Sequence, residues 1–243
     1  AVGVGLTVTT TCPYVTINSS SLNKVNIQSG NAAGIINAFN YTVAAFVPDN
    51  TPAVFDIILT DSVGTVWNTS ITHLLKAPVL QVYSITVSDP TGNNNGVLEP
   101  GETADVTIKT NNKGHSATTT STATLATSSP YLTINNTSYN TGVVQALSDV
   151  DATFNVSLAS NIQIGSTFDM QFNIDANPYS DNKIFNMVAG EILENFEYGN
   201  FTTYPWLNNG NHPWTITNSG TFQGAYAARS AISADGDTSD LAI

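Results

Sequence analysis

The sequence predicts an all-β protein made of Ig-like β-sandwich modules, and three observations carry this prediction. Apolar and polar residues alternate in short stretches, and clusters of Asn, Gly, Ser and Pro separate these stretches about every 10 to 15 residues. No stretch has the apolar periodicity of a helix of three turns. Part of the sequence is also repeated within the chain. Antiparallel sheets with one wet face produce this alternation, which favours β-sandwiches.

The alternation is clearest in residues 39–43, 104–109 and 167–175, each of which we expect to form a half-buried strand. The residues expected on the buried faces of these strands are Phe39, Tyr41, Val43, Ala104, Val106, Ile108, Phe168, Met170, Phe172 and Ile174.

The internal repeat divides the chain into modules. Residues 6–22 match residues 123–139, with Pro13 on Pro130 and Tyr14 on Tyr131. The match continues with AFNYTV at 38–43 on TFNVSL at 153–158, and with PAVFDIIL at 52–59 on GSTFDMQF at 165–172. The offset drifts from 117 to 115 to 113 residues, as loops of different length between matching strands would cause. Two copies of one module are therefore predicted.

We expect three domains. Residues 1–77 form a first module that lacks its N-terminal strands, because the match begins about 40 residues into the second copy. Residues 78–190 form a complete second module, and residues 191–243 begin a third domain that is incomplete at its C-terminal end. A sandwich that lacks strands exposes core and sheet edges, so we expect a partner segment to complete the first module, unless the chain is nicked or represented only in part.

The stretch DPTGNNNGVLEPGE at 89–102 has the composition of a calcium loop. Calcium binds six to eight oxygen ligands, and a 12-residue EF-hand loop supplies them at alternating positions and ends on a bidentate Glu. Counting back from the Glu at the twelfth position leaves Thr91 at the first, so Asp89 must supply the missing carboxylate. The predicted ligands are Asp89, Asn93, Asn95, the Val97 carbonyl, Glu99 and Glu102.

The alternative is an ordinary turn between two strands, because Asn, Gly and Pro form turns without any metal. A turn alone does not explain why Glu102 follows Gly96 by six residues. We therefore expect a structural Ca²⁺ ion in this loop, which lies before a strand that starts near Thr103.

Composition excludes several function classes. The chain has 6 Lys and Arg against 18 Asp and Glu, for a net charge of −12 over 243 residues, so it lacks the basic surface that binds a phosphate backbone. No apolar run approaches the roughly 18 residues of a membrane span. We therefore expect neither nucleic-acid binding nor membrane insertion. The lone Cys12 has no partner for a disulfide or redox motif, and we expect it in a buried or half-buried strand position.

The C-terminal residues resemble a known family. The matching residues are Phe196, Glu197, Trp206, Pro213, Trp214, Ile216, Gly224, Tyr226, Ala228 and Ser230. This pattern resembles the start of the cleaved-adhesin type of jelly roll that follows the catalytic domain in gingipain-like cysteine peptidases. The modules before it, with the 89–102 loop and the stretch ADVTIKTNNKG, are similar to Ig-like repeats of such peptidases and of other type IX secreted surface proteins.

The resemblance implies an accessory region without the catalytic residues of the peptidase. It also implies that Glu197 helps to bind a structural calcium ion, the alternative being a solvated carboxylate at a strand end. Trp206 and Trp214 could form a sugar-binding aromatic platform with Tyr198, Tyr204 and Tyr226, although such residues more often fill the core of a thin sandwich.

Catalysis within the chain is not expected. The pairs Asp149/Asp151 and Asp235/Asp237 are predicted to be solvated turns without a His or Lys partner. The expected function is a noncatalytic, secreted or cell-surface β-sandwich array that is stabilised by calcium and acts as a spacer or adhesion region. Its partners would be neighbouring parts of the same protein, or a host or matrix protein or glycan. The alternatives are an accessory region that stabilises a gingipain-like cysteine peptidase or docks its substrate, and a glycan-binding module.

Overall fold

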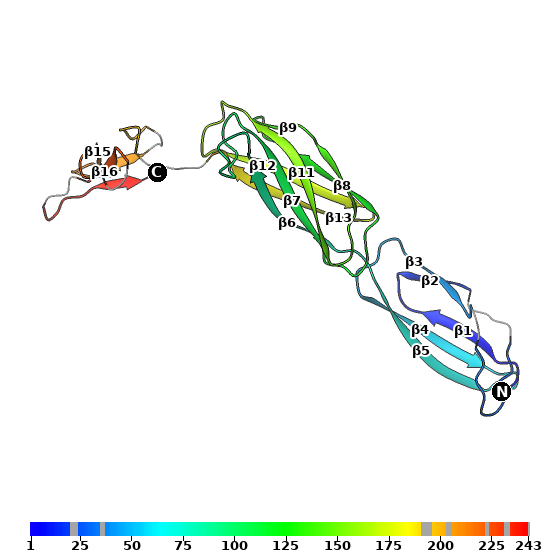
Figure 1. The fold of residues 1–243 in the computed structure, drawn as a ribbon. Coiled ribbons are helices and arrows are strands. Elements are labelled where there is room, and N and C mark those ends of the chain that lie inside the picture. The colour runs from blue at the N-terminus through cyan, green and yellow to red at the C-terminus, as the bar shows by residue number, and fades with distance from the viewer. Residues whose placement is uncertain are drawn as a thin grey trace. The chain divides into compact units, whose positions relative to one another are not determined.

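The computed structural model describes residues 1–19, 24–34, 37–190, 196–202, 206–221, 224–230 and 234–242. These residues form β-strands joined by turns (Figure 1), and the prediction of an all-β fold is confirmed. The part of the chain that is described contains no helix that could cross a membrane. The chain divides into two compact units, Ala1–Gly190 and Glu191–Ile243.

The second module is a sandwich of two four-stranded antiparallel sheets (Figure 1). One sheet has the order β6-β7-β11-β9, with β6 at Leu80–Ser88, β7 at Thr103–Asn112, β11 at Ser148–Leu158 and β9 at Leu132–Ile134. The other has the order β10-β8-β12-β13, with β10 at Ser138–Val143, β8 at Thr120–Ala126, β12 at Thr167–Ala176 and β13 at Tyr179–Val188.

The core of this sandwich comes from the alternating residues. In β12 the side chains of Phe168, Met170, Phe172 and Ile174 are all buried, as predicted, and so are Ala104, Val106 and Ile108 in β7. The rings of Phe154 and Phe172 join the two sheets edge to face, with 6.1 Å between their centroids. Full burial of one such side chain stabilises the fold by about 1.5–3 kcal/mol.

The first module contains a three-stranded sheet, β1-β4-β5, and a two-stranded ladder, β2-β3. Its strands are β1 at Gly5–Thr10, β2 at Val15–Ser19, β3 at Asn40–Val43, β4 at Thr51–Thr60 and β5 at Val66–Leu75. A smaller apolar cluster around Val8, Ala53 and Phe55 fills the space between them. Cys12 is half-buried against this cluster, but it lies in the connection after β1 and not in a strand.

The repeat is visible in the strand pairing. Thr16 pairs with Thr42 as Thr133 pairs with Ser157, so the ladder β2-β3 has the register of β9-β11. The sheet β1-β4-β5 likewise corresponds to β8-β12-β13.

One part of the predicted match is wrong by two residues. The Thr10 hydroxyl donates to the Val54 carbonyl, and its counterpart Thr127 donates to the Asp169 carbonyl. Val54 therefore corresponds to Asp169, at an offset of 115 residues where the sequence match gave 113. The shift escapes sequence comparison because two residues are one full period of a strand, which leaves the buried face unchanged.

The C-terminal unit contains two short antiparallel ladders. β14 at Leu207–Asn209 pairs with β17 at Asp240–Ala242, and β15 at Thr215–Thr217 pairs with β16 at Ala227–Arg229.

Candidate functional site

The predicted calcium loop joins β6 to β7, and Asp89 anchors it. The Asp89 side chain is fully buried. Its Oδ1 accepts the Gly96 N–H at 2.9 Å, and its Oδ2 accepts the Asn95 N–H at 3.3 Å. This carboxylate therefore ties the first residue of the loop to its middle.

Two asparagines and Glu99 form the outer part of the loop. The Asn93 and Asn95 amides donate to Glu99 Oε2 and Oε1 at 2.8 and 3.3 Å. The Oδ1 atoms of Asn93 and Asn95 accept the N–H groups of Asn95 and Val97, at 3.0 and 2.8 Å. Glu99 therefore points toward the asparagines, and all three predicted side chains lie together.

Glu102 lies on the other side of the loop. Its Oε2 accepts the Glu99 N–H at 3.0 Å, and its own N–H donates to the Glu99 carbonyl at 3.1 Å. A Cβ on Gly92 would lie 2.2 Å from Glu102 Oε1. A side chain at position 92 would therefore displace this carboxylate.

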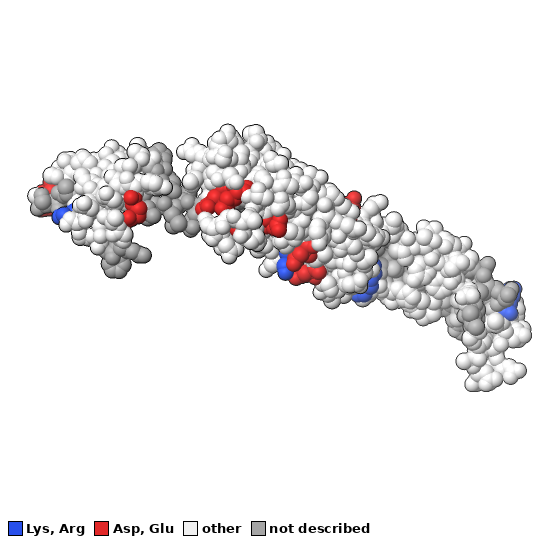
Figure 2. Space-filling view, turned by 45° about the horizontal axis from the view of Figure 1, so that its top comes forward, with Lys and Arg blue, Asp and Glu red and all other residues white. Residues whose placement is uncertain are grey.

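The donor chemistry of the loop fits calcium. Three carboxylates and three side-chain amides lie within these 14 residues, and the hydrogen bonds to the carboxylates come from the N–H groups and amides of the loop. A buried carboxylate without a cation is costly, and Ca²⁺ would supply the missing charge. Each carboxylate instead accepts hydrogen bonds from the loop itself, and within the described ranges no three His, Cys, Asp or Glu residues converge on one point. Figure 2 shows Asp and Glu gathered in patches over the second module.

Glu197 supports a turn in the C-terminal unit. Its Oε2 and Oε1 accept the N–H groups of Ala225 and Tyr226 at 2.8 and 3.2 Å. A Cβ on Gly224 would lie 2.0 Å from Glu197 Oε1, and Gly224 has a φ of +79°. The carboxylate is therefore tied to the backbone of this turn, which differs from the alternative of a solvated carboxylate at a strand end.

The aromatic residues of this unit differ in exposure, and Tyr226 is 36% exposed. Trp206 is half-buried, and its ring lies tilted against the Phe196 ring with 6.3 Å between their centroids. Trp214 is also half-buried, and its backbone N–H donates to Asn208. Tyr198 is exposed, whereas Tyr204 lies outside the described residues.

The prediction that Asp149/Asp151 and Asp235/Asp237 are turns without a His or Lys partner is wrong in part, although Asp235 lies in a turn as predicted. Asp149 and Asp151 lie in β11, where Asp151 contacts Lys109 at 3.8 Å. Asp237 contacts His212 at 3.1 Å. The partners come from strands and loops distant in sequence, which the local spacing does not reveal.

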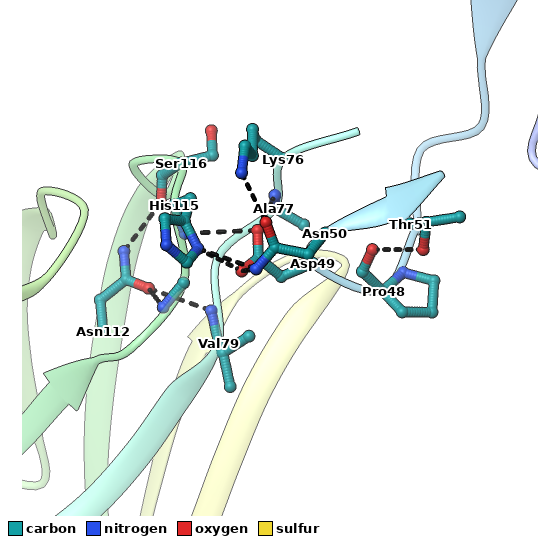
Figure 3. A network of polar contacts seen from close by, with 11 residues as sticks. Pro48, Asp49, Asn50, Thr51, Lys76, Ala77, Val79, Asn112, His115 and Ser116 are labelled. Carbon is teal, nitrogen blue, oxygen red and sulfur yellow. Dashed lines mark hydrogen bonds and ion pairs between the residues drawn. The ribbon is translucent and has the colours of Figure 1, made fainter. Parts of the chain in front are cut away.

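The sequence did not point to a polar network at the junction of the first two modules (Figure 3). Asp49 of the first module lies 2.6 Å from the ring Nδ1 of His115 in the second. Asp49 Oδ1 also accepts the N–H groups of Ala77 and His115, at 2.9 and 3.3 Å. Burial alone would raise the pKa of Asp49, but these hydrogen bonds and the nearby His115 lower it to about 2.

Asn112 holds the same junction from the side of the second module. Its side chain is fully buried, and its Oδ1 accepts the N–H groups of Val79 and Gly114, both at 3.0 Å. Its amide donates to the carbonyls of Ser116, Val144 and Gln145. A Cβ on Gly114 would lie 2.1 Å from the Ala77 carbonyl oxygen. The backbone that connects β5 to β6 therefore packs directly on this glycine.

Aromatic and apolar groups flank the network. The Tyr179 hydroxyl bonds to both the N–H and the carbonyl of Val47, each at 3.1 Å, and its ring contacts Phe46 at 5.3 Å. A cavity of about 350 Å³ lies among Phe46, Val47, Pro48, Asp49, Pro78, Val79, Leu80, Pro178, Tyr179 and Ser180.

No family model matches the sequence, and no curated protein matches it either. Among the solved structures that match is BcpA, the major pilin subunit of Bacillus cereus, with 9% sequence identity and a TM-score of 0.25. The match covers 77% of this chain and 64% of the pilin chain, so this chain spans less than two thirds of the length of the pilin.

Proposed function

We propose that the chain is a noncatalytic region of a secreted or cell-surface protein, in which consecutive β-sandwiches act as a stiff spacer or adhesion region and calcium stabilises the second module. The observation that carries this proposal is the junction network. Four residues, 76–79, connect β5 to β6. Flexible linkers are rich in Gly and Ser, whereas this linker reads Lys-Ala-Pro-Val.

The backbone of the linker is bound from both modules. The N–H groups of Ala77 and Val79 donate to Asp49 and Asn112, respectively. The carbonyls of the same two residues accept the N–H groups of Ser116 and Lys113, at 3.3 and 2.8 Å. A linker bound at four backbone groups loses the freedom to act as a hinge, so the two modules move as one body.

Four carboxylates accept hydrogen bonds from the backbone of the protein, which supports a noncatalytic role. Asp49, Asp89, Glu102 and Glu197 all accept backbone N–H groups of loops or of the linker. A general acid or base needs its proton-accepting oxygen to face a substrate. These oxygens face the protein backbone instead.

Calcium would act on the loop between β6 and β7. The residues that would hold it are Asp89, Asn93, Asn95, Val97, Glu99 and Glu102, and the ion would supply positive charge between carboxylates that have none. Extracellular calcium sites bind with dissociation constants of about 0.1 mM. At about 1 mM calcium such a site stabilises the folded state by roughly 1.4 kcal/mol.

Limited proteolysis with trypsin tests the stiff junction, because Lys76 lies within it and Lys24 lies in an exposed connection of the first module. We expect cleavage after Lys24 to be at least tenfold faster than cleavage after Lys76, as measured by mass spectrometry of the fragments. In the Asp49→Ala variant, cleavage after Lys76 should accelerate while cleavage after Lys24 stays constant. Equal rates at the two sites in the unmodified chain would refute the stiff junction.

A further inference from the structure

The first module has an open side where the second module is closed. In the second module β11 pairs with β9 on one edge and with β7 on the other. Its counterpart β3 pairs with β2, and within the described residues no strand lies on its other edge. The described part of the first module likewise has no counterpart of β6 and β7.

The free edge of β3 has hydrogen-bonding groups directed outward. The Ala44 N–H donates to the Tyr14 carbonyl at 2.8 Å, so the N–H and carbonyl of Val43 point away from β2. The counterpart of Val43 is Leu158, whose N–H donates to the Glu102 carbonyl and whose carbonyl accepts the Gly101 N–H, both at 2.9 Å. Val43 therefore presents the same backbone N–H and carbonyl that Leu158 uses to bind the residues directly before β7.

Apolar side chains beside this edge are exposed although their counterparts are buried. Val43 is 37% exposed, whereas Leu158 is 2% exposed. On β5, Ile71 pairs with Phe55 as Phe185 pairs with Met170, so Ile71 is the counterpart of Phe185. Ile71 is 38% exposed, and Phe185 is 8% exposed.

Strand β6 is what covers Phe185 in the second module. The Val82 N–H donates to Asp181 at 2.6 Å, and the Lys183 ammonium donates to the Tyr83 carbonyl at 3.1 Å, so β6 lies along β13. In the first module the space beside β5 is a groove of about 660 Å³, lined by Tyr41, Val43, Thr72, His73, Leu74, Leu75 and Lys76. We call this hollow between β3 and β5 the acceptor groove.

We propose that the acceptor groove binds a pair of β-strands with the chemistry of β6 and β7. The inner strand of the pair would run antiparallel to β3 and bond to the backbone of Val43, as in strand addition to a sheet edge. Its alternate residues would be aliphatic, as Ala104, Val106 and Ile108 are in β7, and would cover the half-buried Tyr41 and the exposed Val43. The outer strand would cover Ile71, as β6 covers Phe185. Such a pair would bind whether or not the array serves as a spacer.

A peptide of residues 80–112 is the probe, because it contains both strands in the order that the second module uses. Titration of the complete chain with this peptide should give a complex with one peptide per chain. Hydrogen exchange followed by NMR should show protection of the Val43 amide on binding, with the Leu158 amide unchanged.

Two isoleucines of equal exposure provide matched variants. Ile71 pairs with the buried Phe55 at the end of the groove and is the counterpart of Phe185, whereas Ile58 lies on the outer face of β4, and both are 38% exposed. Ile71→Lys should weaken peptide binding at least tenfold, while Ile58→Lys should leave it unchanged. Val43→Pro removes the amide that faces the groove but keeps the bond from Ala44 to Tyr14, and it should also abolish binding. Circular dichroism melting of each variant verifies that it folds.

Three results would overturn the proposal. One is the absence of saturable binding to the folded chain. Another is binding that Ile71→Lys does not weaken, or that protects the Leu158 amide from hydrogen exchange and leaves the Val43 amide unprotected. The peptide would then occupy another surface. The third is a dimer of the chain that protects Val43 and that the peptide fails to disrupt, which would assign the groove to a second copy.

Discussion

At the scale of residues, the protein uses carboxylates to hold backbone. Asp169 shows the same use as Asp49: hydrogen bonds from the Ser128 hydroxyl and the Gln171 amide, opposed by burial, lower its pKa to about 2. The carboxylate also accepts the Ser128 N–H at 3.1 Å. Such groups stabilise the fold only while they are ionised.

Asp49 predicts how the junction responds to acid. Its pKa in the folded state, about 2, lies below the ordinary value of 3.8. The carboxylate therefore stabilises the fold fully above pH 3.8, and this stabilisation is lost as the pH falls toward 2. Asp49→Ala should lower the free energy of unfolding by about 2 kcal/mol at pH 7, because it leaves the Ala77 N–H without its charged acceptor.

Denaturant titration between pH 2 and 7 measures this effect. The difference between Asp49→Ala and the unmodified chain should shrink below pH 4. Asp151→Asn is the control, since Asp151 is an exposed member of a 3.8 Å ion pair that contributes little. A constant difference across this pH range would show that Asp49 does not act through its charge.

Glu102 predicts the response to calcium. Removal of calcium with a chelator should lower the melting temperature of the second module by roughly 5 °C, as a loss of about 1.4 kcal/mol implies for a domain of this size. Glu102→Gln should melt lower than the unmodified chain in calcium and should no longer respond to chelator. Differential scanning calorimetry measures both. If the unmodified chain melts at the same temperature with and without chelator, the loop acts as a turn alone.

At the scale of elements, the sequence predicted the strands better than their connections. Burial with a period of two defined β7 and β12, because both strands have one face in a core. For β3 the pattern also gave a strand, but Val43 is exposed because the sheet ends there. The composition of the 89–102 loop suggested its ligands, and the structure gathers Asn93, Asn95 and Glu99 because they are close in sequence.

Sequence patterns could not predict the polar network at the junction of the first two modules. Asp49 and His115 are 66 residues apart, and neither lies in a motif. They meet at the junction where Ala77 and Val79 pack against Gly114. Polar contacts across a module boundary depend on tertiary structure, and local residue spacing does not encode it.

Gly114 predicts how sensitive this element is to an added side chain. Gly114→Ala would place a Cβ 2.1 Å from the Ala77 carbonyl oxygen and 2.5 Å from the Val79 nitrogen. The backbone must move, and we expect a loss of about 1–3 kcal/mol in the free energy of unfolding. Gly34→Ala is the control, because nothing lies within 4 Å of its Cβ position. Equal stability of the two variants in denaturant would mean that the linker does not pack on Gly114.

At the scale of the whole molecule, the two copies of the repeated module differ in how their sandwiches are closed. The second module closes its sandwich with β6 and β7, whereas the first module presents the acceptor groove and holds its neighbour through Asp49. These features support an array that transmits a fixed spacing along the chain. The net charge of −12 gives the surface of such an array a negative potential.

Residual dipolar couplings of backbone amides test the stiff array most directly. In a partly aligned sample of the complete chain, we expect a single alignment tensor to fit the amides of residues 1–77 and 78–190 together. The Asp49→Ala variant should require two tensors, with unchanged couplings inside each module. If the unmodified chain already requires two tensors of different magnitude, the modules move independently and the proposed spacer role is contradicted.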